Sequence, residues 1–450
     1  MIGACEKLVE KALKRGLSEV EVYAVRNLAR QFTVAKDRIV EAVYRDDLEV
    51  GVRGAIGKRV GFVRLNSLEV GVEEALDRLV AIAKSSPEDP YWSGFPADGK
   101  PLPPVKSFDE KTVSRSEEEL VEVLEHTMSK LKEPALAKGV EAASVTEGFF
   151  SVMSLEVAVV NSNGLSRAAR RSVVELWLIL SVEKGGLQSD KAMTYSKNML
   201  DERELEKLAL EEGENALLFF GARPVESGVY DLVLTPLATS DILAYSLAPA
   251  FSALNVLENR SPIRDKLGKQ VLSEEITLVD DPALEGATGT RPFDDEGVAT
   301  RAKHVVDKGF IAGLLHNYYT ARRMNAEPTG NGIRQRPHML PLPNFTNMVL
   351  KPGSGSFEEF ARDVSRGILV YEVIGHWMSD FVTGTAKATI THGLLVEGGR
   401  VVRPVKGVVI GGSVYEWLSS NLVGVGKDVV VYSNFAAPSI WIRGAKVAGQ

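Results

Sequence analysis

The sequence contains a single cysteine, Cys5, among its 450 residues. One cysteine cannot form an intramolecular disulfide, a CxxC pair or a multi-cysteine zinc knuckle, so these features are excluded. Sparing use of cysteine is typical of proteins in a reducing compartment, and we therefore expect a cytoplasmic protein.

Long uncharged hydrophobic runs are also absent. No uncharged apolar stretch reaches the about 18 residues that suggest a membrane helix. Charged side chains interrupt the apolar residues of segment 1–16, which argues against the hydrophobic centre of a signal peptide. We expect neither export nor a membrane span.

Basic residues are not in excess. Lys and Arg total 53 against 60 for Asp and Glu, which gives a formal net charge of −7. Proteins that bind nucleic acid directly use a basic surface to release counterions from the phosphate backbone. The charge balance therefore disfavours a nucleic-acid partner.

The rest of the composition is that of an ordinary globular protein, with 44% hydrophobic and 25% charged residues. Such a composition excludes disorder as the dominant state. A chain of this length usually divides into domains of roughly 100–200 residues each. Local sequence patterns predict an α+β fold with three parts.

Residues 1–100 are predicted to form an N-terminal α+β subdomain with antiparallel strands. Apolar residues recur at helical spacing in 4–15, and apolar and polar residues alternate, as in a strand, over 20–24. Further β-rich segments and one helix follow at 30–44, 47–54, 59–65 and 71–84.

Residues 105–220 are predicted to form a second α+β subdomain. It follows the segment 86–107, which is predicted to be a linker because its many prolines lack the backbone donor that helices and central strands need. A helix begins after Ser116, since Ser116 and Glu119 form a capping box. Strands, a turn and a final helix are predicted at 141–147, 152–160, 162–164, 172–182 and 201–219.

Residues 222–450 are predicted to form a β-rich C-terminal domain. Glycines are scattered among short β-rich runs such as 368–374, 394–396 and 408–410. Because such glycines mark bends and bulges, we expect a barrel-like or strongly curved antiparallel sheet. A helix candidate over 239–254 precedes these runs; Asp241 is its only charged residue, and Pro249 interrupts it.

Common catalytic motifs are missing. No two of the six histidines stand four residues apart, so an HExxH zinc helix is absent, and so are the P-loop and the GxSxG motif. Glu372 and His376 would be neighbours on a helix. The segment before Gly375 is apolar and β-branched, however, and on a strand the two residues stand about 13 Å apart at roughly 3.3 Å per residue. We expect a strand and a structural role for both.

Three consecutive carboxylates, Asp294, Asp295 and Glu296, follow Arg291. They could supply oxygen ligands to a hard cation. Alternatively they form a solvated turn with Arg291 as a local counter-charge. Three consecutive side chains cannot all point at one ion from a regular strand, and the EF-hand spacing is missing, so the turn is favoured.

Several segments are nevertheless typical of one protein family. The most specific lie at 289–300, 320–322, 329–332 and 340–347, and their sequences are GTRPFDDEGVAT, TAR, TGNG and LPLPNFTN. Further matches lie at 382–384, 395–401, 404–405 and 445–450, with weaker ones at 51–53, 61–62 and 161–164. Over essentially the whole chain, these segments resemble the TldD/PmbA family of two-component peptidases, also known as modulators of DNA gyrase.

The resemblance is closer to one branch of this family than to the other. In the TldD branch, two histidines of an HExxxH helix and a late cysteine hold zinc, and the glutamate is the general base. Here the corresponding positions are Ala244, Tyr245 and Pro249, and no late cysteine exists. Alanine and proline side chains offer no donor atom, so the resemblance implies the metal-free PmbA, or TldE, branch. No cofactor is expected in this chain, and zinc is expected only in a TldD-like partner.

The resemblance implies a particle in which a TldD-like zinc subunit cuts unfolded peptides and this chain completes the cleft. It implies no catalytic or metal-binding residue here. The family-like loops suggest these residues as substrate or partner contacts: Arg291, Asp294, Asp295, Asn331, Arg334, Asn344 and Asn347.

Three alternatives stay open. The chain could be an active hydrolase that uses Asp294, Asp295 and Glu296, or Glu372 and His376. It could be an adaptor that touches DNA gyrase, although the acidic charge balance does not favour this. A homodimer is an alternative to the heterodimeric assembly.

Overall fold

The computed structural model of the chain describes residues 1–97 and 99–449. Asp98 of the predicted linker and Gln450 of the last family-like segment lie outside these described residues. Within the described ranges, no helix is both long enough and apolar enough to cross a membrane.

The N-terminal half is built on one antiparallel sheet with the strand order β3-β2-β1-β4-β5-β6. Its strands are β1 (Glu19–Ala35), β2 (Arg38–Ile56), β3 (Arg59–Leu65), β4 (Ala142–Asn161), β5 (Ser166–Lys184) and β6 (Leu187–Lys197). β1 pairs with β2 on one side and with β4 on the other. The strands of the first two predicted subdomains therefore share one sheet, and the domain boundaries themselves stay a prediction.

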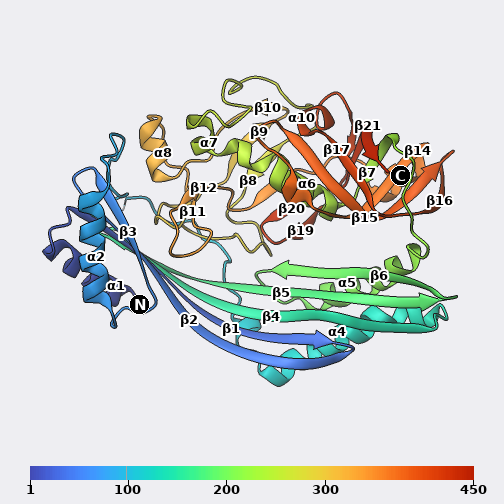
Figure 1. The fold of residues 1–450 in the computed structure, drawn as a ribbon, viewed down its shortest axis with the longest axis horizontal. Helices are drawn as coiled ribbons and strands as arrows, with labels where there is room; N and C mark the ends of the chain where they lie inside the picture. The colour runs from blue at the N-terminus through green and yellow to red at the C-terminus, as the bar shows by residue number, and fades with distance from the viewer. Residues whose placement is uncertain (98, 450) are drawn as a thin grey trace.

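Helices cover one face of this sheet, and the C-terminal half lies over the other (Figure 1). The helices are α1 (Ile2–Lys14), α2 (Val72–Ser85), α3 (Glu110–Val113), α4 (Glu117–Ala137) and α5 (Glu202–Asn215), with a short 3-10 helix at Ala216–Leu218. Side chains of a strand alternate between its faces. Accordingly Val22 of β1 packs with Leu76 of α2, and Phe32 packs with Leu124 of α4, while Tyr23 points towards the C-terminal half.

Two strand predictions need correction. The predicted strand over 30–44 contains the turn between β1 and β2, where Lys36 and Asp37 have φ angles of 50° and 62°. No glycine or proline marks this turn; instead, the Asp37 carboxylate accepts hydrogen bonds from the Val145 N–H (2.9 Å) and from Lys132 (2.8 Å). The predicted strands 141–147 and 152–160 form the single strand β4. The capping box of Ser116 and Glu119 is confirmed at the start of α4.

The C-terminal half contains a closed five-stranded barrel, which confirms the predicted barrel-like form. The order β14-β7-β21-β17-β15 closes because β14 also pairs with β15. All pairs are antiparallel except β7 with β14, which is parallel. The strands are β7 (Gly228–Leu234), β14 (Arg366–Ile374), β15 (Thr385–Glu397), β17 (Val408–Ser413) and β21 (Ile440–Ala448), with β16 (Arg400–Val405) and β18 (Leu422–Val425) attached.

A second six-stranded sheet has the order β10-β9-β8-β13-β20-β19. Its strands are β8 (Leu278–Asp280), β9 (Lys303–Asp307), β10 (Phe310–Ile311), β13 (Met348–Leu350), β19 (Val430–Tyr432) and β20 (Phe435–Ala437), and a separate pair is formed by β11 (Gly332–Ile333) and β12 (Leu342–Pro343). The turn after β19 reaches the N-terminal sheet, where the Ser433 N–H donates to the Ser196 carbonyl of β6 at 2.8 Å.

Short helices complete the C-terminal half: α6 (Pro236–Ser246), α7 (Ala253–Leu257), α8 (Tyr318–Arg323), α9 (Phe357–Asp363), α10 (Val414–Trp417) and the 3-10 helices Ala248–Phe251 and His376–Met378. Aliphatic side chains from the barrel strands and α6 pack together in one buried core, which includes Leu232, Leu243, Ile368, Ile390, Ile410 and Ile442. This core fixes α6 against the barrel, at the place where the zinc-motif positions lie.

Candidate functional site

Helix α6 is shorter than the sequence pattern predicts. It begins with Pro236 as its first residue, after the Thr235 hydroxyl, which caps the Ala238 N–H. It ends at Ser246 and gives way to a 3-10 helix that contains Pro249. Proline has no N–H for the helical ladder and its ring clashes with the preceding turn, which explains the early end.

The zinc-motif positions lie around this end of α6. Ala244 is half-buried, and the Tyr245 ring is exposed and packs against His376, with 5.3 Å between the ring centroids. Pro249 falls in the 3-10 helix, beyond the end of α6. In the described part of the chain, no group of three or more His, Cys, Asp or Glu side chains is placed to hold a metal ion.

Asp241 is the one carboxylate on α6. Burial, and then the nearby charge of Glu372, raise the pKa of Asp241 to about 7. The structure gives this side chain neither a hydrogen bond nor an ion pair within the described ranges. Asp241 is therefore a carboxylate whose ionised form the surrounding protein does not stabilise.

Glu372 lies on β14, and His376 lies in the 3-10 turn that follows Gly375, so the predicted strand and turn are confirmed. Glu372 contacts residues that the sequence pattern did not indicate. It pairs with Lys191 of β6, which also pairs with Glu212 of α5 at 2.8 Å. His392 of β15 places its Nδ1 atom 2.7 Å from Glu372 Oε2.

This cluster controls the charge of Glu372. Burial raises the pKa of Glu372, but the Lys191 ammonium and the His392 ring lower it by more, and the net result is a pKa of about 2. Lys191 and Glu212 come from β6 and α5 of the N-terminal half, whereas Glu372 and His392 come from the barrel, so no motif spacing could have revealed this cluster. Only the juxtaposition of β6, α5 and β15 brings these residues to Glu372.

The acidic run 294–296 forms a turn, as predicted, but the prediction that the turn is solvated is wrong. Asp294, Asp295 and Glu296 are 0%, 5% and 2% exposed. The predicted pairing of Asp295 with Arg291 is confirmed at 3.1 Å. The turn is buried because β1 and β2, from the other half of the chain, cover it, and local sequence cannot show this.

Each carboxylate of the run has specific partners. The Asp294 carboxylate accepts hydrogen bonds of 2.8 to 3.0 Å from the backbone N–H groups of Glu296, Val298 and Gly332. Burial and the neighbouring charge of Glu296 raise the pKa of the Asp294 carboxyl. Hydrogen bonds from the Tyr23 hydroxyl (2.9 Å) and the Arg334 N–H (2.7 Å) converge on Asp295. These contacts occupy the oxygens that a cation would need.

A buried ion-pair network then joins the two halves of the chain. Arg53 of β2 donates to both oxygens of Glu21 at 2.9 and 2.8 Å and reaches Glu296 at 3.2 Å. Arg334 donates to Glu21 as well, and its guanidinium lies over the Tyr23 ring. Burial raises the pKa of Glu21, but the two arginines reverse this and lower it.

Asn331 and Asn347 belong to neighbouring buried clusters. Asn331 donates to the Asp280 carboxylate and accepts a hydrogen bond from Lys303, both within 2.9 Å. The Asn347 amide donates to the Asp281 carbonyl at 2.6 Å. Gly289 approaches this loop so closely that a Cβ atom would lie 1.9 Å from the Thr346 carbonyl oxygen, which explains the glycine in the GTRPFDDEG segment.

The predicted contact residues are therefore brought together, but not on an open surface. All of them except Asn344 are buried. They tie the family-like loops to each other and to β1 and β2. Their role as contacts to a substrate or partner stays a prediction, to which exposed Asn344 is best suited.

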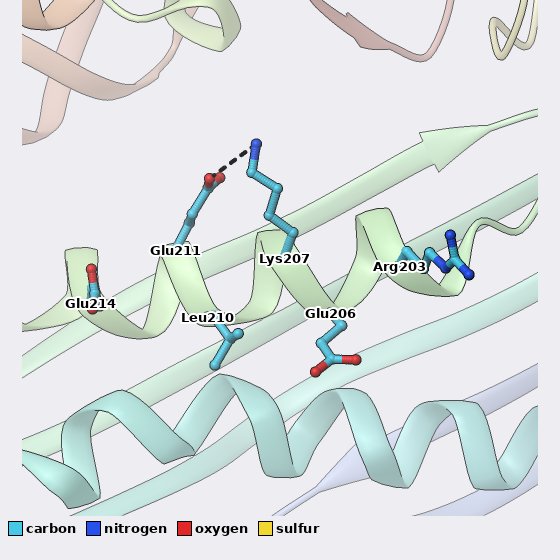
Figure 2. A pocket seen from close by; sticks show the side chains of 6 residues that line it. All are labelled: Arg203, Glu206, Lys207, Leu210, Glu211 and Glu214. Carbon is cyan, nitrogen blue, oxygen red and sulfur yellow. Dashed lines mark ion pairs between the residues drawn. The ribbon is translucent and has the colours of Figure 1, made fainter.

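A surface depression on α5 has a different character. Figure 2 shows its lining side chains, Arg203, Glu206, Lys207, Leu210, Glu211 and Glu214. Lys207 and Glu211 form an ion pair of 3.4 Å one helical turn apart, and both are largely exposed. Such exposed pairs on a helix are ordinary surface features, and we do not regard this depression as a site.

Comparison with protein families gives two matches to this chain. The model described as PmbA/TldA metallopeptidase C-terminal domain matches residues 227–449. The model described as PmbA/TldA metallopeptidase domain 1 matches residues 20–86. The first match covers the barrel, α6 and the family-like loops, and the second covers β1 to β3 and α2.

Individual proteins show the same similarity. A protein of Methanothermobacter thermautotrophicus named metalloprotease is 29% identical over 329 residues, which cover 70% of this chain and 72% of that protein. An uncharacterized protein of Methanocaldococcus jannaschii is 28% identical over 449 residues, 98% of each chain. The crystal structure of TldE from Thermococcus kodakarensis matches with a TM-score of 0.89 and 26% identity, over 99% of this chain and 100% of that one.

Proposed function

We propose that this chain, which belongs to the TldD/PmbA family of metallopeptidase-like proteins, is the non-catalytic, TldE-like subunit of a two-subunit peptidase. Its partner is a TldD-like zinc subunit, and the substrate is an unfolded peptide. The chain completes the cleft of the pair and supports substrate binding.

One observation carries this proposal. Alanine, tyrosine and proline stand at positions 244, 245 and 249, and α6 ends before the last of them. A zinc peptidase needs ligands that hold the metal and a base that helps to activate its water, and the metal lowers the pKa of that water to about 7. Side chains of alanine and proline can do neither.

The sheet face opposite the helices supports a role in holding a peptide. On β5, Leu176 and Leu178 are buried in the core with α4, whereas Glu175 and Trp177 alternate with them and are half-buried on the other face. Phe149 of β4 lies beside Trp177, with 6.3 Å between ring centroids. Aromatic and carboxylate groups on a broad curved sheet suit contact with an extended chain.

The contacts of the described candidate carboxylates argue against the alternative of an independent hydrolase. Its candidate carboxylates at 294–296 are buried and engaged by backbone N–H groups and arginines. Glu372 is engaged by Lys191 and His392. A general base or a metal ligand must reach its substrate or ion, and these groups are occupied inside the protein.

The test is a peptide-cleavage assay on this chain, on a TldD-like subunit from the same organism, and on an equimolar mixture. We expect no cleavage by this chain alone, co-elution of the mixture in size-exclusion chromatography, and faster cleavage by the mixture. A mixture in which the partner's zinc ligands are replaced by alanine is the control and should be inactive.

Two results would overturn the proposal. The first is metal-dependent peptide cleavage by this chain alone. The second is a mixture whose subunits neither co-elute nor change each other's rate.

Metal content provides a separate prediction. Because Ala244 and Pro249 offer no ligand, the purified chain should carry no stoichiometric zinc by elemental analysis. About one zinc per chain that survives mild chelation would contradict the non-catalytic assignment.

A further inference from the structure

We propose that His392 is held in its doubly protonated form and acts as a pH-dependent clamp between the edge of the N-terminal sheet and the C-terminal barrel. The clamp concerns the joint between two halves of this chain. It therefore goes beyond the proposed peptidase role and can fail independently of it.

The geometry around the His392 ring carries this proposal. Irregular pairing of β14 with β15 places Glu372 directly opposite His392. The ring Nδ1 lies 2.7 Å from Glu372 Oε2, and the ring Nε2 lies 2.5 Å from the carbonyl oxygen of Asp190. Asp190 belongs to β6, the outermost strand of the N-terminal sheet. The ring thus bridges the barrel and that sheet.

Both ring nitrogens face hydrogen-bond acceptors. A neutral imidazole has one N–H group, so it can satisfy only one of the two contacts, whereas an imidazolium satisfies both. The Thr391 hydroxyl, 3.1 Å from Nδ1, could donate to a neutral ring. That arrangement would leave an oxygen of the ionised Glu372 carboxylate 2.7 Å from a nitrogen lone pair, which is repulsive.

The charges that surround the ring also balance only with a cation at His392. Lys191 of β6 lies between Glu212 of α5 and Glu372 of β14, and its side chain is 3% exposed. One lysine cannot neutralise two carboxylates, and the imidazolium supplies the missing positive charge.

The other groups near the ring do not replace this cation. Asp241 of α6, whose pKa is raised by burial and by Glu372, adds no positive charge. The Asp190 carboxylate accepts hydrogen bonds from Gln188. Phe219 packs its ring against His392 at 4.8 Å between centroids, nearly perpendicular.

Loss of the ring proton therefore weakens this joint. One of the two hydrogen bonds of the ring disappears, and a partly buried cluster acquires net negative charge. The other end of the sheet stays fixed by the hydrogen bond from Tyr23 to Asp295 and by the hydrogen bond from Arg334 to Glu21. On β5, Arg167 is level with the Tyr23 contact and Ser181 is level with the His392 clamp. These two residues are about 46 Å apart along the strand at about 3.3 Å per residue. The Ser433 N–H also holds β6 at the Ser196 carbonyl, so movement should concentrate in the part of β6 around Asp190.

Two measurements on the full chain test the proposal. Selective ¹⁵N labelling of histidine, with His392 assigned from the missing signal in His392→Gln, reports the protonation of both ring nitrogens. We expect both nitrogens to be protonated at pH 7.5. Hydrogen exchange of the β6 amides, corrected for intrinsic rates, should then accelerate at least about tenfold when the ring loses its proton at higher pH, because a hydrogen bond to a charged group is lost.

His392→Gln should remove this pH response. The matched control is His304→Gln. His304 is half-exposed on β9, and its contact with the exposed Asp307 side chain is 3.5 Å long. The control should keep the pH response of β6. If His392→Gln fails to fold, His392→Asn serves for assignment and the wild-type measurements decide. A neutral His392 ring at pH 7.5, or β6 exchange that does not change with pH, would overturn the clamp.

Discussion

Buried charges of opposite sign hold one end of the N-terminal sheet to the C-terminal half. Glu21 is 0% exposed and receives hydrogen bonds from Arg53 and Arg334, which come from opposite halves of the chain. A buried ion pair gains little over an apolar pair of the same shape, but loss of one partner leaves the other charge uncompensated.

Replacement of Arg334 by methionine should therefore destabilise the protein strongly. The change leaves Glu21 with one arginine and removes the cation that lies over Tyr23. We expect a loss of about 3–5 kcal/mol in the free energy of unfolding, measured by urea denaturation. The control is Arg26→Met, whose pair with Asp46 is exposed and should leave the midpoint unchanged. An equal loss in both variants would contradict the role of the buried network.

Replacement of Asp241 should have the opposite effect to Arg334→Met and should stabilise the protein at high pH. Its pKa is raised to about 7, so the folded state binds the proton more tightly than the unfolded state does. Stability from this group is present at low pH and is lost as pH rises from about 4 to about 7. Asp241→Asn should thus be stabilising at pH 8, by no more than about 4 kcal/mol at 1.4 kcal/mol per pKa unit, and nearly neutral at pH 4. Thermal unfolding at the two pH values decides; destabilisation at pH 8 would show that the carboxylate has a partner.

Local sequence predicted some of these residues and missed others for a physical reason. Arg291 and Asp295 are four residues apart, so their pairing could be predicted. Tyr23 and Arg53, the partners of Asp295 and Glu296, lie more than two hundred residues away from them, and Glu21 lies more than three hundred residues from its partner Arg334. Only the fold brings these residues together. Burial of the acidic turn follows from these distant partners, and local sequence alone therefore predicts a solvated turn.

The start of α4 could be predicted from a signal within a few residues, whereas α6 begins at Pro236, three residues before the predicted start. The capping box of Ser116 and Glu119 satisfies backbone N–H groups at the start of α4, and it is present as expected. The turn between β1 and β2 was missed because its φ angles depend on Asp37 contacts to Lys132 and Val145. The end of α6 depends on Pro249. The sequence pattern predicts a helix up to residue 254, whereas α6 ends at Ser246.

Loss of the cap should weaken α4. Ser116→Ala removes the hydroxyl that accepts the Glu119 N–H and should cost about 1 kcal/mol of stability, measured by urea denaturation. Ser420→Ala is a suitable control, because Ser420 is exposed and, among the described residues, its hydroxyl bonds only the half-buried Asn421 side chain. Equal midpoints for the two variants would show that the cap contributes nothing.

At the scale of the molecule, one sheet unites strands that the sequence divides between two units. The predicted unit 1–100 contains β1 to β3, but β1 pairs with β4, and Ala158 and Val160 of β4 complete the core around α1 and α2. The linker between the units gave a clear signal in proline content, whereas sheet pairing across it left none.

Fragments test this consequence. A fragment of residues 1–100 should lack cooperative unfolding in near-ultraviolet circular dichroism, because it has no β4 to cover β1. A fragment of residues 1–220 contains all six strands and should unfold cooperatively. A sharp transition in the shorter fragment would show that the first unit folds without its neighbour.

The barrel also sets an order of events during translation. β7 begins the barrel at Gly228, but it needs β21, which ends at Ala448. The N-terminal sheet can assemble once Lys197 has left the ribosome, whereas the barrel stays open until β21 has been made. The edges of β7 and β17 that pair with β21 stay exposed during that interval, and such exposed edges attract aggregation and chaperones. A chain that terminates shortly before β21 should therefore have a folded N-terminal half and should aggregate through its C-terminal half.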